Sequence, residues 1–365
     1  MTRQSSGPPP LRKMILPAIF VGALFVVVFL RQPAESSREQ WSLNGHAIGT
    51  TFTVKLVLPD GPHGTRAEVA AAIRRILDEV DRSMSTYRTD SEISRFNDFG
   101  TESFEASRSL LVVMEEALRV AELTGGAFDV TVGPLVDAWG FGPETPSKPP
   151  DAAAIDRLLE ENGFRRVVVD PVNGTLRKDR AALRCDLSAI AKGFAVDRVA
   201  EGMGALGFDD FMVEIGGEVR AAGRNAHEEA WRIGVEKPQL VRGGVWNVVA
   251  LANAAMATSG DYRNYYERDG VRISHLIDPR TGRPITHTLA SVSVVHSSCM
   301  TADALATAIS ILGPDEGREL VEREHIAALF LIRNTDGGFD QWSSRAWPVE
   351  NIEPQSSVAP GGDKR

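Results

Sequence analysis

The sequence predicts an α+β protein in which mixed or antiparallel β-sheets are flanked by helices, preceded by an N-terminal signal-anchor helix. Of the 365 residues, 43% are hydrophobic and 24% are charged, which is an ordinary composition for a globular protein with a sizeable core. Some segments have apolar residues at helical spacing, and others are rich in β-branched and aromatic residues. Because the two kinds interleave without a repeating βαβ unit, a doubly wound parallel sheet is not expected.

The segment Met14–Leu30 is apolar and uncharged throughout, and it lies between the basic residues Arg12, Lys13 and Arg31. Its length is just sufficient to cross a bilayer as a helix. Because no small-residue cleavage site follows Leu30, an uncleaved signal anchor is favoured over a cleavable signal peptide. The preceding positive charges place residues 1–13 in the cytoplasm and the rest of the chain outside it. We therefore expect a linker at 31–40, one folded domain at 41–349 and a disordered tail at 350–365.

Within the folded domain, apolar spacing predicts helices at residues 67–84 and 110–124. A Pro-rich loop at 143–150 separates them from a helix at 153–162 and a strand at 166–170, and the turn Val172–Thr175 predicts a hairpin. The second half is expected to contain strands at 211–215, 231–235, 245–251 and 289–295 and helices at 190–206 and 302–312.

Charge and cysteine content exclude several classes of function. The net charge is -9, and no Lys/Arg stripe could neutralise a phosphate backbone, so nucleic acid is not expected as a partner. Cys185 and Cys299 are too few for a disulfide framework or a cysteine-rich zinc site, and neither adjoins the apolar segment, which excludes a lipoprotein anchor. The two cysteines either pair in an oxidising compartment or remain as buried thiols. No GxGxxG follows a predicted strand and no GxxxxGK[ST] is present, so a dinucleotide would have to bind by other means.

Asp303 and Thr307 are four residues apart on a predicted helix, so their side chains lie on one face, one turn apart. A carboxylate and a hydroxyl are hard oxygen donors that suit Mg²⁺, which takes few protein ligands. The alternative is structural: Thr301 would cap the helix and Asp303 would only offset its dipole. Spacing alone leaves both interpretations open.

Three other segments carry candidate functional groups. Asp186 and Lys192 flank a predicted strand-to-helix junction, where free backbone groups are available to a ligand, although a capping Asp186 and a solvated Lys192 would also fit. His275 is the best general-base candidate by side-chain chemistry, although a histidine beside a turn is often structural. The glycine-flanked segments 125–134 and 214–218 either let backbone approach a flat ligand or mark turns.

Together and in this order, these segments resemble the FAD:protein FMN transferases, also called the ApbE family. The resemblance extends from about His46 to Leu331. The matching segments are Gly49–Thr51, Ser85–Arg88, Ser94–Asn97, Gly126–Pro134, Trp139–Gly142, Asp186–Gly193, Glu214–Glu218, Thr258–Tyr262, His275–Gly282, Ala302–Asp303 and Thr307.

The resemblance implies an ApbE-like fold and an enzyme that binds FAD with Mg²⁺, cleaves the pyrophosphate and transfers FMN to a threonine or serine hydroxyl of a partner protein, releasing AMP. The acceptor would be an exported or membrane protein, such as a subunit of a redox-driven membrane complex. The enzyme would be a single-pass protein of the bacterial inner membrane, with its catalytic domain in the periplasm.

The resemblance also implies roles for individual residues. Mg²⁺ would be held by the backbone carbonyl of Ala189 with Asp303 and Thr307, and the general base would be His275, Asp186 or Asp303. The residues implied to contact FAD are Ile48, Tyr87, Ala127, Phe128, Asp129, Asp186, Lys192 and Ile277.

Three positions depart from patterns seen in the family. Ile48 stands where methionine is common, Ala306 stands where some members have another acid, and Lys192, where some members have glutamate, would place a cation near the diphosphate. Two alternative functions stay open, namely an Mg²⁺-dependent FAD pyrophosphatase yielding free FMN and AMP, and a non-catalytic flavin-binding protein of the envelope. The Asp303/Thr307 pair argues against a purely binding role.

Overall fold

The computed structural model describes residues 37–61, 63–142, 148–238, 244–262, 264–268 and 271–348. The predicted signal-anchor helix at 14–30, the N-terminal residues 1–13 and the tail at 350–365 lie outside these ranges. Among the helices in the described ranges, none combines the length and apolar character needed to span a bilayer. The first strand begins at Gln40, and Arg38 already donates a backbone hydrogen bond to the carbonyl of Ala226, so the folded part begins within the predicted linker.

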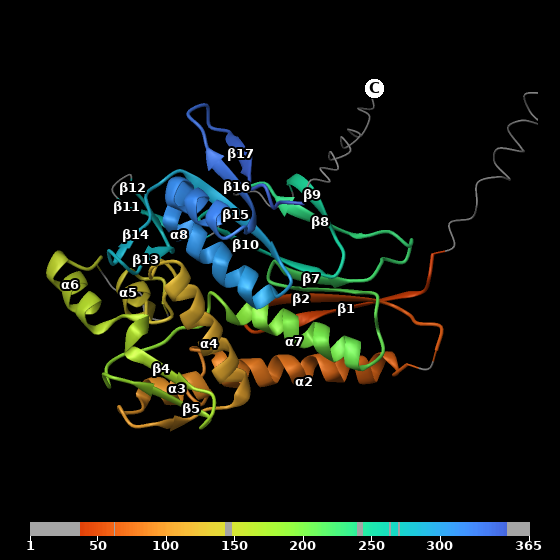
Figure 1. Cartoon of the computed structure of the whole chain (residues 1–365), viewed down its shortest axis with the longest axis horizontal. Helices are drawn as coiled ribbons and strands as arrows, with labels where there is room; N and C mark the ends of the chain where they lie inside the picture. Colours follow the sequence, from red (N-terminus) through yellow and green to blue (C-terminus); the bar gives the residue numbers. More distant parts are fainter. Residues whose placement is uncertain are drawn as a thin grey trace, which may run out of the picture.

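An eight-stranded sheet forms the centre of the domain (Figure 1). Every neighbouring pair in it is antiparallel, which confirms the predicted α+β architecture and, of its mixed or antiparallel sheets, the antiparallel arrangement. In spatial order the strands are β1 (Gln40–Ala47), β2 (Thr50–Val57), β6 (Phe211–Ile215), β7 (Glu218–Ala222), β10 (Ala254–Gly260), β15 (Leu289–His296), β16 (Ala327–Arg333) and β17 (Phe339–Ser343).

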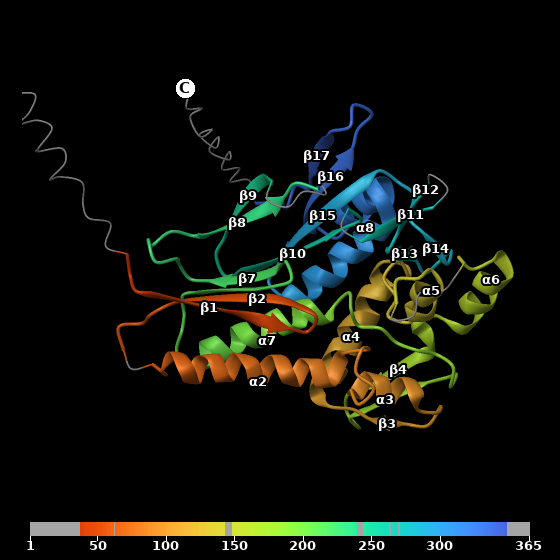
Figure 2. The same cartoon turned by 180° about the vertical axis from the view of Figure 1, so that it is seen from behind.

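Each face of the sheet packs against its own hydrophobic core, because successive side chains of a strand point to opposite faces. Ala255 and Ala257 lie in the larger core under the helices, whereas Met256 between them lies in the smaller core. The smaller core packs against a separate hairpin, β8 (Trp231–Glu236) and β9 (Val245–Leu251), on the side of the sheet opposite α2 and α7 (Figures 1 and 2).

The larger core is covered by α2 (Arg66–Met84), α4 (Arg108–Leu123), α7 (Ala191–Ala205) and α8 (Cys299–Arg323). The amphipathic helix α2 begins at a capping box in which Thr65 and Glu68 exchange side-chain and backbone hydrogen bonds. Helices α7 and α8 cross closely at Gly193, where a Cβ atom would lie only 2.3 Å from the carbonyl oxygen of Cys299. Only glycine allows this approach, which brings the start of α7 to the first turns of α8.

Helix α8 extends beyond both predicted ends, 302 and 312, but its regular part does end at Leu312. Gly313 has a non-helical φ of 80° and is followed by Pro314, whose ring cannot continue the ladder of hydrogen bonds. The N-cap is Ser298, so the alternative in which Thr301 caps the helix is wrong. Thr301 instead donates from its hydroxyl to Glu116 on α4 at 2.6 Å, which joins the two helices.

Smaller elements surround this framework and include the predicted hairpin at residues 172–175. Cys185 and Cys299 are buried free thiols, so the structure supports the unpaired alternative. The remaining elements are α3 (Glu92–Asp98), β3 (Phe104–Glu105), α5 (Gly133–Ala138), α6 (Ala152–Glu161), the 3₁₀ helix η1 (Phe164–Arg166), β4 (Val167–Asp170), β5 (Thr175–Lys178), β11 (Tyr265–Arg268), β12 (Val271–Ser274), β13 (Ile277–Asp278) and β14 (Arg283–Pro284).

Candidate active site

A cavity of about 400 Å³ lies where the starts of α7 and β7, the first turns of α8 and the end of β10 meet several loops. The structure brings together there most of the residues that the sequence singled out. Those that line the cavity are Tyr87, Phe128, Asp129, Asp186, Ala189, Lys192, His275, Ile277, Asp303 and Thr307.

Two residues expected to contact FAD do not line this cavity. Ile48 lies in the turn between β1 and β2, has a positive φ of 43° and packs against the larger core. Ala127 is fully buried in a small cluster with Leu276, Ile285 and Ile311. Because Leu276 and Ile311 do line the cavity, Ala127 supports its wall from behind.

Lys192 lies between two buried carboxylates, contrary to the solvated alternative. Its ammonium is 3.2 Å from Glu218 and 3.3 Å from Asp303, whose side chains are only 4% and 6% exposed. Burial lowers the pKa of Lys192, but attraction to Asp303 and Glu218 outweighs this effect and raises it above its ordinary value. The lysine is therefore charged at neutral pH. Burial also raises the pKa of Glu218, to about 8.

Asp303 receives a second donor from the backbone. The N–H of Gly193 donates to its Oδ2 at 3.0 Å, a contact that depends on the close crossing of α7 and α8. Glu218 keeps one oxygen free, because its buried Oε2 has no hydrogen-bond partner within the described residues. The sequence had marked the segment of Glu218 for its glycines and as one of the matching motifs, but it gave Glu218 no role.

The donor set around Asp303 fits a small divalent cation that favours oxygen. Two buried acidic side chains face one lysine, so oxygen acceptors outnumber the single ammonium that serves them. The hydroxyl of Thr307 and residue Ala189 line the same cavity. In the described part of the chain, no three His, Cys, Asp or Glu side chains gather around a common point. A cation would thus depend on few side chains and on backbone and substrate oxygens, which suits Mg²⁺.

The position of α8 is fixed by an acid that the sequence analysis did not single out. Asp197 on α7 accepts hydrogen bonds from the Ser298 hydroxyl at 2.8 Å and from the backbone N–H groups of Cys299 and Met300, each at 3.0 Å. Arg220 on β7 donates to the same carboxylate at 2.6 Å. Asp197 therefore satisfies the free N–H groups at the start of α8 and anchors the helix that carries Asp303.

The segment before α7 is a loop rather than the expected end of a strand. Asp186 caps no helix, since its carboxylate accepts from the N–H of Ser188 at 2.7 Å and the N-cap position of α7 is Ile190. Asn97 holds the loop by a pair of hydrogen bonds to the backbone of Cys185, at 2.8 and 2.7 Å. The N–H of Asp186 also donates to the carbonyl of Val130 at 2.7 Å, which joins this loop to the segment of Asp129.

Asp129 lines the cavity, but both of its carboxylate oxygens have internal partners. The N–H and hydroxyl of Thr131 donate to Oδ1 at 2.8 and 2.7 Å, and the N–H of Phe164 donates to Oδ2 at 2.9 Å. Burial raises the pKa of Asp129 above its ordinary value despite these bonds. Its role toward a ligand is therefore to shape the wall of the cavity.

His275 is oriented by a backbone carbonyl. Its Nδ1 lies 2.8 Å from the carbonyl oxygen of Asn264, and because a carbonyl only accepts, Nδ1 must carry the proton. In the neutral ring, the lone pair is then on Nε2. Burial lowers the pKa of His275 below its ordinary value, so the neutral form predominates at pH 7. An oriented neutral imidazole in the cavity wall is suited to accept a proton.

Tyr87 lies at the rim of the cavity and is 75% exposed. A large aromatic ring that is so accessible offers a stacking surface to a planar ligand or to an incoming protein. It lies three residues after Met84, the last residue of α2.

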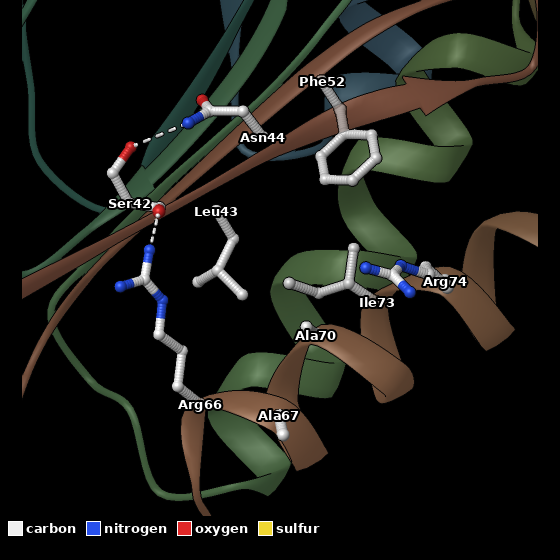
Figure 3. A pocket seen from close by; sticks show the side chains of 9 residues that line it. All are labelled: Ser42, Leu43, Asn44, Phe52, Arg66, Ala67, Ala70, Ile73 and Arg74. Carbon is white, nitrogen blue, oxygen red and sulfur yellow. Dashed lines mark hydrogen bonds between the residues drawn. The ribbon is translucent and has the colours of Figure 1, made fainter.

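A larger hollow of about 590 Å³ lies between β1 and the first half of α2 (Figure 3). Its apolar side chains are Leu43, Phe52, Ala70 and Ile73, and Arg66 and Arg74 lie on either side of them. None of the side chains that line it is an acid, a histidine or a cysteine. The hollow therefore has no general base and no carboxylate for a cation, and the chemistry is assigned to the smaller cavity.

Comparisons with known proteins show which family the chain is similar to. The family model described as the ApbE family matches residues 48–330. A Vibrio cholerae protein named FAD:protein FMN transferase is 44% identical over 318 residues, which cover 86% of this chain and 93% of that protein. An Escherichia coli K12 protein of the same name is 37% identical over 336 residues, which cover 90% of this chain and 94% of that protein.

Solved structures show the same fold. The flavin transferase ApbE from Vibrio cholerae superposes with a TM-score of 0.78 at 43% identity, covering 85% of this chain and 98% of that one. The apo form of the Pseudomonas stutzeri flavinyl transferase ApbE gives a TM-score of 0.78 at 36% identity, covering 85% of this chain and 96% of that one.

Proposed function

The chain belongs to the ApbE family and is a flavin transferase, and we propose that it transfers FMN from FAD to a threonine or serine hydroxyl of an exported or membrane protein, with Mg²⁺ and with release of AMP. The observation that carries this proposal is the presence of Asp303, Thr307 and Ala189 in one cavity with the oriented base His275. The names of the relatives supply the donor and the transferred group.

The residues of the chain divide into those that hold FAD and those that act on the reacting atoms. Phe128 and Ile277 provide apolar walls of the cavity, and Tyr87 provides an aromatic surface at the rim. The ammonium of Lys192 provides a fixed positive charge toward the diphosphate. The carbonyl of Ala189, the carboxylate of Asp303 and the hydroxyl of Thr307 would hold Mg²⁺, which when bound neutralises charge on the diphosphate.

His275 is the preferred general base among the three candidates. Its free Nε2 accepts the proton of the acceptor hydroxyl, and the hydroxyl oxygen forms a bond to the FMN phosphorus. The bond from that phosphorus to the bridging oxygen breaks, and AMP leaves with the electron pair. Asp303 is less suited to this role because the ammonium of Lys192 and the N–H of Gly193 already engage its carboxylate. Asp186 is engaged by Ser188.

The test is a flavinylation assay with the full-length enzyme. FAD, Mg²⁺ and an exported protein that carries a threonine flavinylation motif are incubated with the enzyme, and the mixture is then denatured and separated. We expect flavin fluorescence on the acceptor band and one AMP for each flavin attached. Free FMN and AMP without a fluorescent band would instead identify an FAD pyrophosphatase.

The membrane location is a separate part of the proposal. It is supported by the apolar segment Met14–Leu30 and the basic residues before it. We propose a single-pass protein of the bacterial inner membrane with the flavin transferase domain in the periplasm. Protease added to intact spheroplasts should then degrade the domain, and protection until lysis would contradict this orientation.

A further inference from the structure

Glu218 belongs to the cavity although the proposed chemistry assigns it no role. It is the first residue of β7 and follows a tight turn at Gly216 and Gly217, which have positive φ values of 65° and 108°. This turn pairs Glu218 with Ile215 across the β6–β7 hairpin and leaves its side chain against the start of α7. A carboxyl side chain that is only 4% exposed requires a hydrogen-bonding partner, and Lys192 is that partner.

The contacts of Lys192 leave one acceptor unused. An ammonium group carries three donor hydrogens. In the structure these reach Asp303, at 3.3 and 3.4 Å, and Glu218 at 3.2 Å, while the buried Oε2 of Glu218 has no hydrogen-bond partner within the described residues. Glu218 can therefore accept a second hydrogen bond from Lys192 if the lysine leaves Asp303.

A cation at Asp303 would compete with Lys192 for the same carboxylate. We propose that Glu218 is a positioning residue that binds the ammonium of Lys192 when Asp303 binds the divalent cation. This inference rests on the cation site of the proposed function. When the cation binds, the ammonium of Lys192 gives up its hydrogen bonds to Asp303, keeps its contact with Oε1 of Glu218 and gains a hydrogen bond to Oε2. The cation then meets a free carboxylate, and the ammonium stays in the cavity as a second positive charge toward the diphosphate.

The decisive variant keeps the charge of Glu218 and shortens its reach. In Glu218→Asp the carboxylate is withdrawn by one methylene, so it no longer reaches Lys192, which must stay on Asp303. We expect Mg²⁺ affinity, measured by titration calorimetry on the full chain in detergent without FAD, to fall roughly 10- to 100-fold, as is usual when a group that orients a metal ligand is lost. If only the charge at position 218 mattered, the affinity would not change.

The same substitution in a Lys192→Met background shows whether Glu218 acts through the lysine. Without the competing ammonium, Glu218→Asp should leave Mg²⁺ affinity unchanged. An equal loss in both backgrounds would make Glu218 a direct ligand of the cation and overturn the proposal.

Glu214→Asp is the matched control, since Glu214 lies in the same segment and accepts from the N–H of Gly217 at 2.9 Å without lining the cavity. It should bind Mg²⁺ like the parent chain.

Two further outcomes are informative. Each variant is checked by thermal unfolding without Mg²⁺. If Glu218→Asp does not fold, Glu218→Gln replaces it, and its effect on Mg²⁺ affinity should depend on Lys192 in the same way. If the parent chain binds no Mg²⁺, the cation site of the proposed function fails and the transfer of Lys192 fails with it. If the parent chain binds Mg²⁺ and Glu218→Asp matches it, the cation site stands and only the role of Glu218 is rejected.

Discussion

Lys178 and Lys192 both make several polar contacts inside the domain, but the groups around them are opposite in kind. The ammonium of Lys178 donates only to carbonyl oxygens, those of Asn97, Ala181 and Leu183, at 2.7, 3.0 and 2.8 Å. Burial lowers its pKa. Lys192 faces two carboxylates, which raise its pKa.

The difference separates a structural group from a functional one. Lys178 ties together the loop that leads to Cys185 and has no room for a ligand, since it is fully buried. Lys192 is 31% exposed toward the cavity and shares its carboxylate partners with whatever binds there. The partners of each lysine, together with its exposure to the cavity, thus indicate whether it holds the fold or takes part in the chemistry.

The largest expected effect comes from neutralising Asp303, one of the two acids that face Lys192. Asp303→Asn should lower Mg²⁺-dependent transfer of FMN by roughly a hundredfold or more, because a lost cation removes several kcal/mol of transition-state stabilisation. The rate of acceptor fluorescence measures this. Asp98→Asn is the control, since Asp98 pairs with Arg184 on the exposed surface near Lys178. Unchanged turnover in Asp303→Asn would remove this residue from the site.

Lys178→Met should instead affect stability. It leaves three carbonyl acceptors without their donor, which we expect to cost about 2–4 kcal/mol of unfolding free energy, measured by urea denaturation. Turnover per folded molecule should stay near that of the parent chain. Arg177→Met on the same strand is the control, because Arg177 is exposed. A selective loss of turnover without loss of stability would contradict the structural role of Lys178.

Mg²⁺ should distinguish the two lysines by thermal unfolding. In Lys192→Met the cation replaces the lost positive charge, so adding Mg²⁺ should raise the melting temperature by a few degrees more than in the parent chain, the size expected for about 1 kcal/mol. Lys178→Met should gain no more than the parent chain does. Equal rises in melting temperature in the two variants would mean that the cation does not bind next to Lys192.

The smallest effect on the parent chain is its response to pH. Burial places the pKa of His275 below its ordinary value of 6.5, and the base must be neutral to act. Activity should therefore persist below pH 6.5 and fall only as pH drops through the lowered pKa. Lys178→Met should keep this acid limb of the kcat/KM profile, and His275→Gln should lose it along with most activity. An acid limb that persists in His275→Gln would assign the base elsewhere.

Local pattern predicted much of the fold. Apolar spacing placed α2, α4, α6 and α7 to within two residues, and alternation placed β6 and β15. The start of α8 was missed because Ser298 and Asp197, which satisfy its free N–H groups, lie 101 residues apart in the sequence. The order of motifs predicted the residues that meet in the cavity. Asn97 and Glu218 stand in matching segments but were given no role, and Asp197 was not singled out, because their roles depend on contacts between distant segments.

Some of the missed residues did leave a signal in the sequence. Lys178 shares the inward face of β5 with Leu176, since side chains two apart on a strand point the same way. A charged residue at an inward position predicts a buried polar contact. Glu218 follows two glycines and precedes the buried Val219 and Ala221. This pattern likewise predicts that the acid lies at the edge of a hydrophobic core. Neither pattern identifies the partner.

The close crossing at Gly193 limits which substitutions the site can accept. The N–H of this residue holds Asp303, its neighbour Lys192 faces the same carboxylate, and its missing side chain lets the two helices meet. Any other residue there would place a carbon 2.3 Å from one carbonyl and 2.8 Å from the Cβ of Asp303. The distance between Asp303 and Lys192 is therefore fixed by a position that tolerates only a hydrogen atom as its side chain. Directed evolution can change the walls of the cavity far more freely than it can change residue 193.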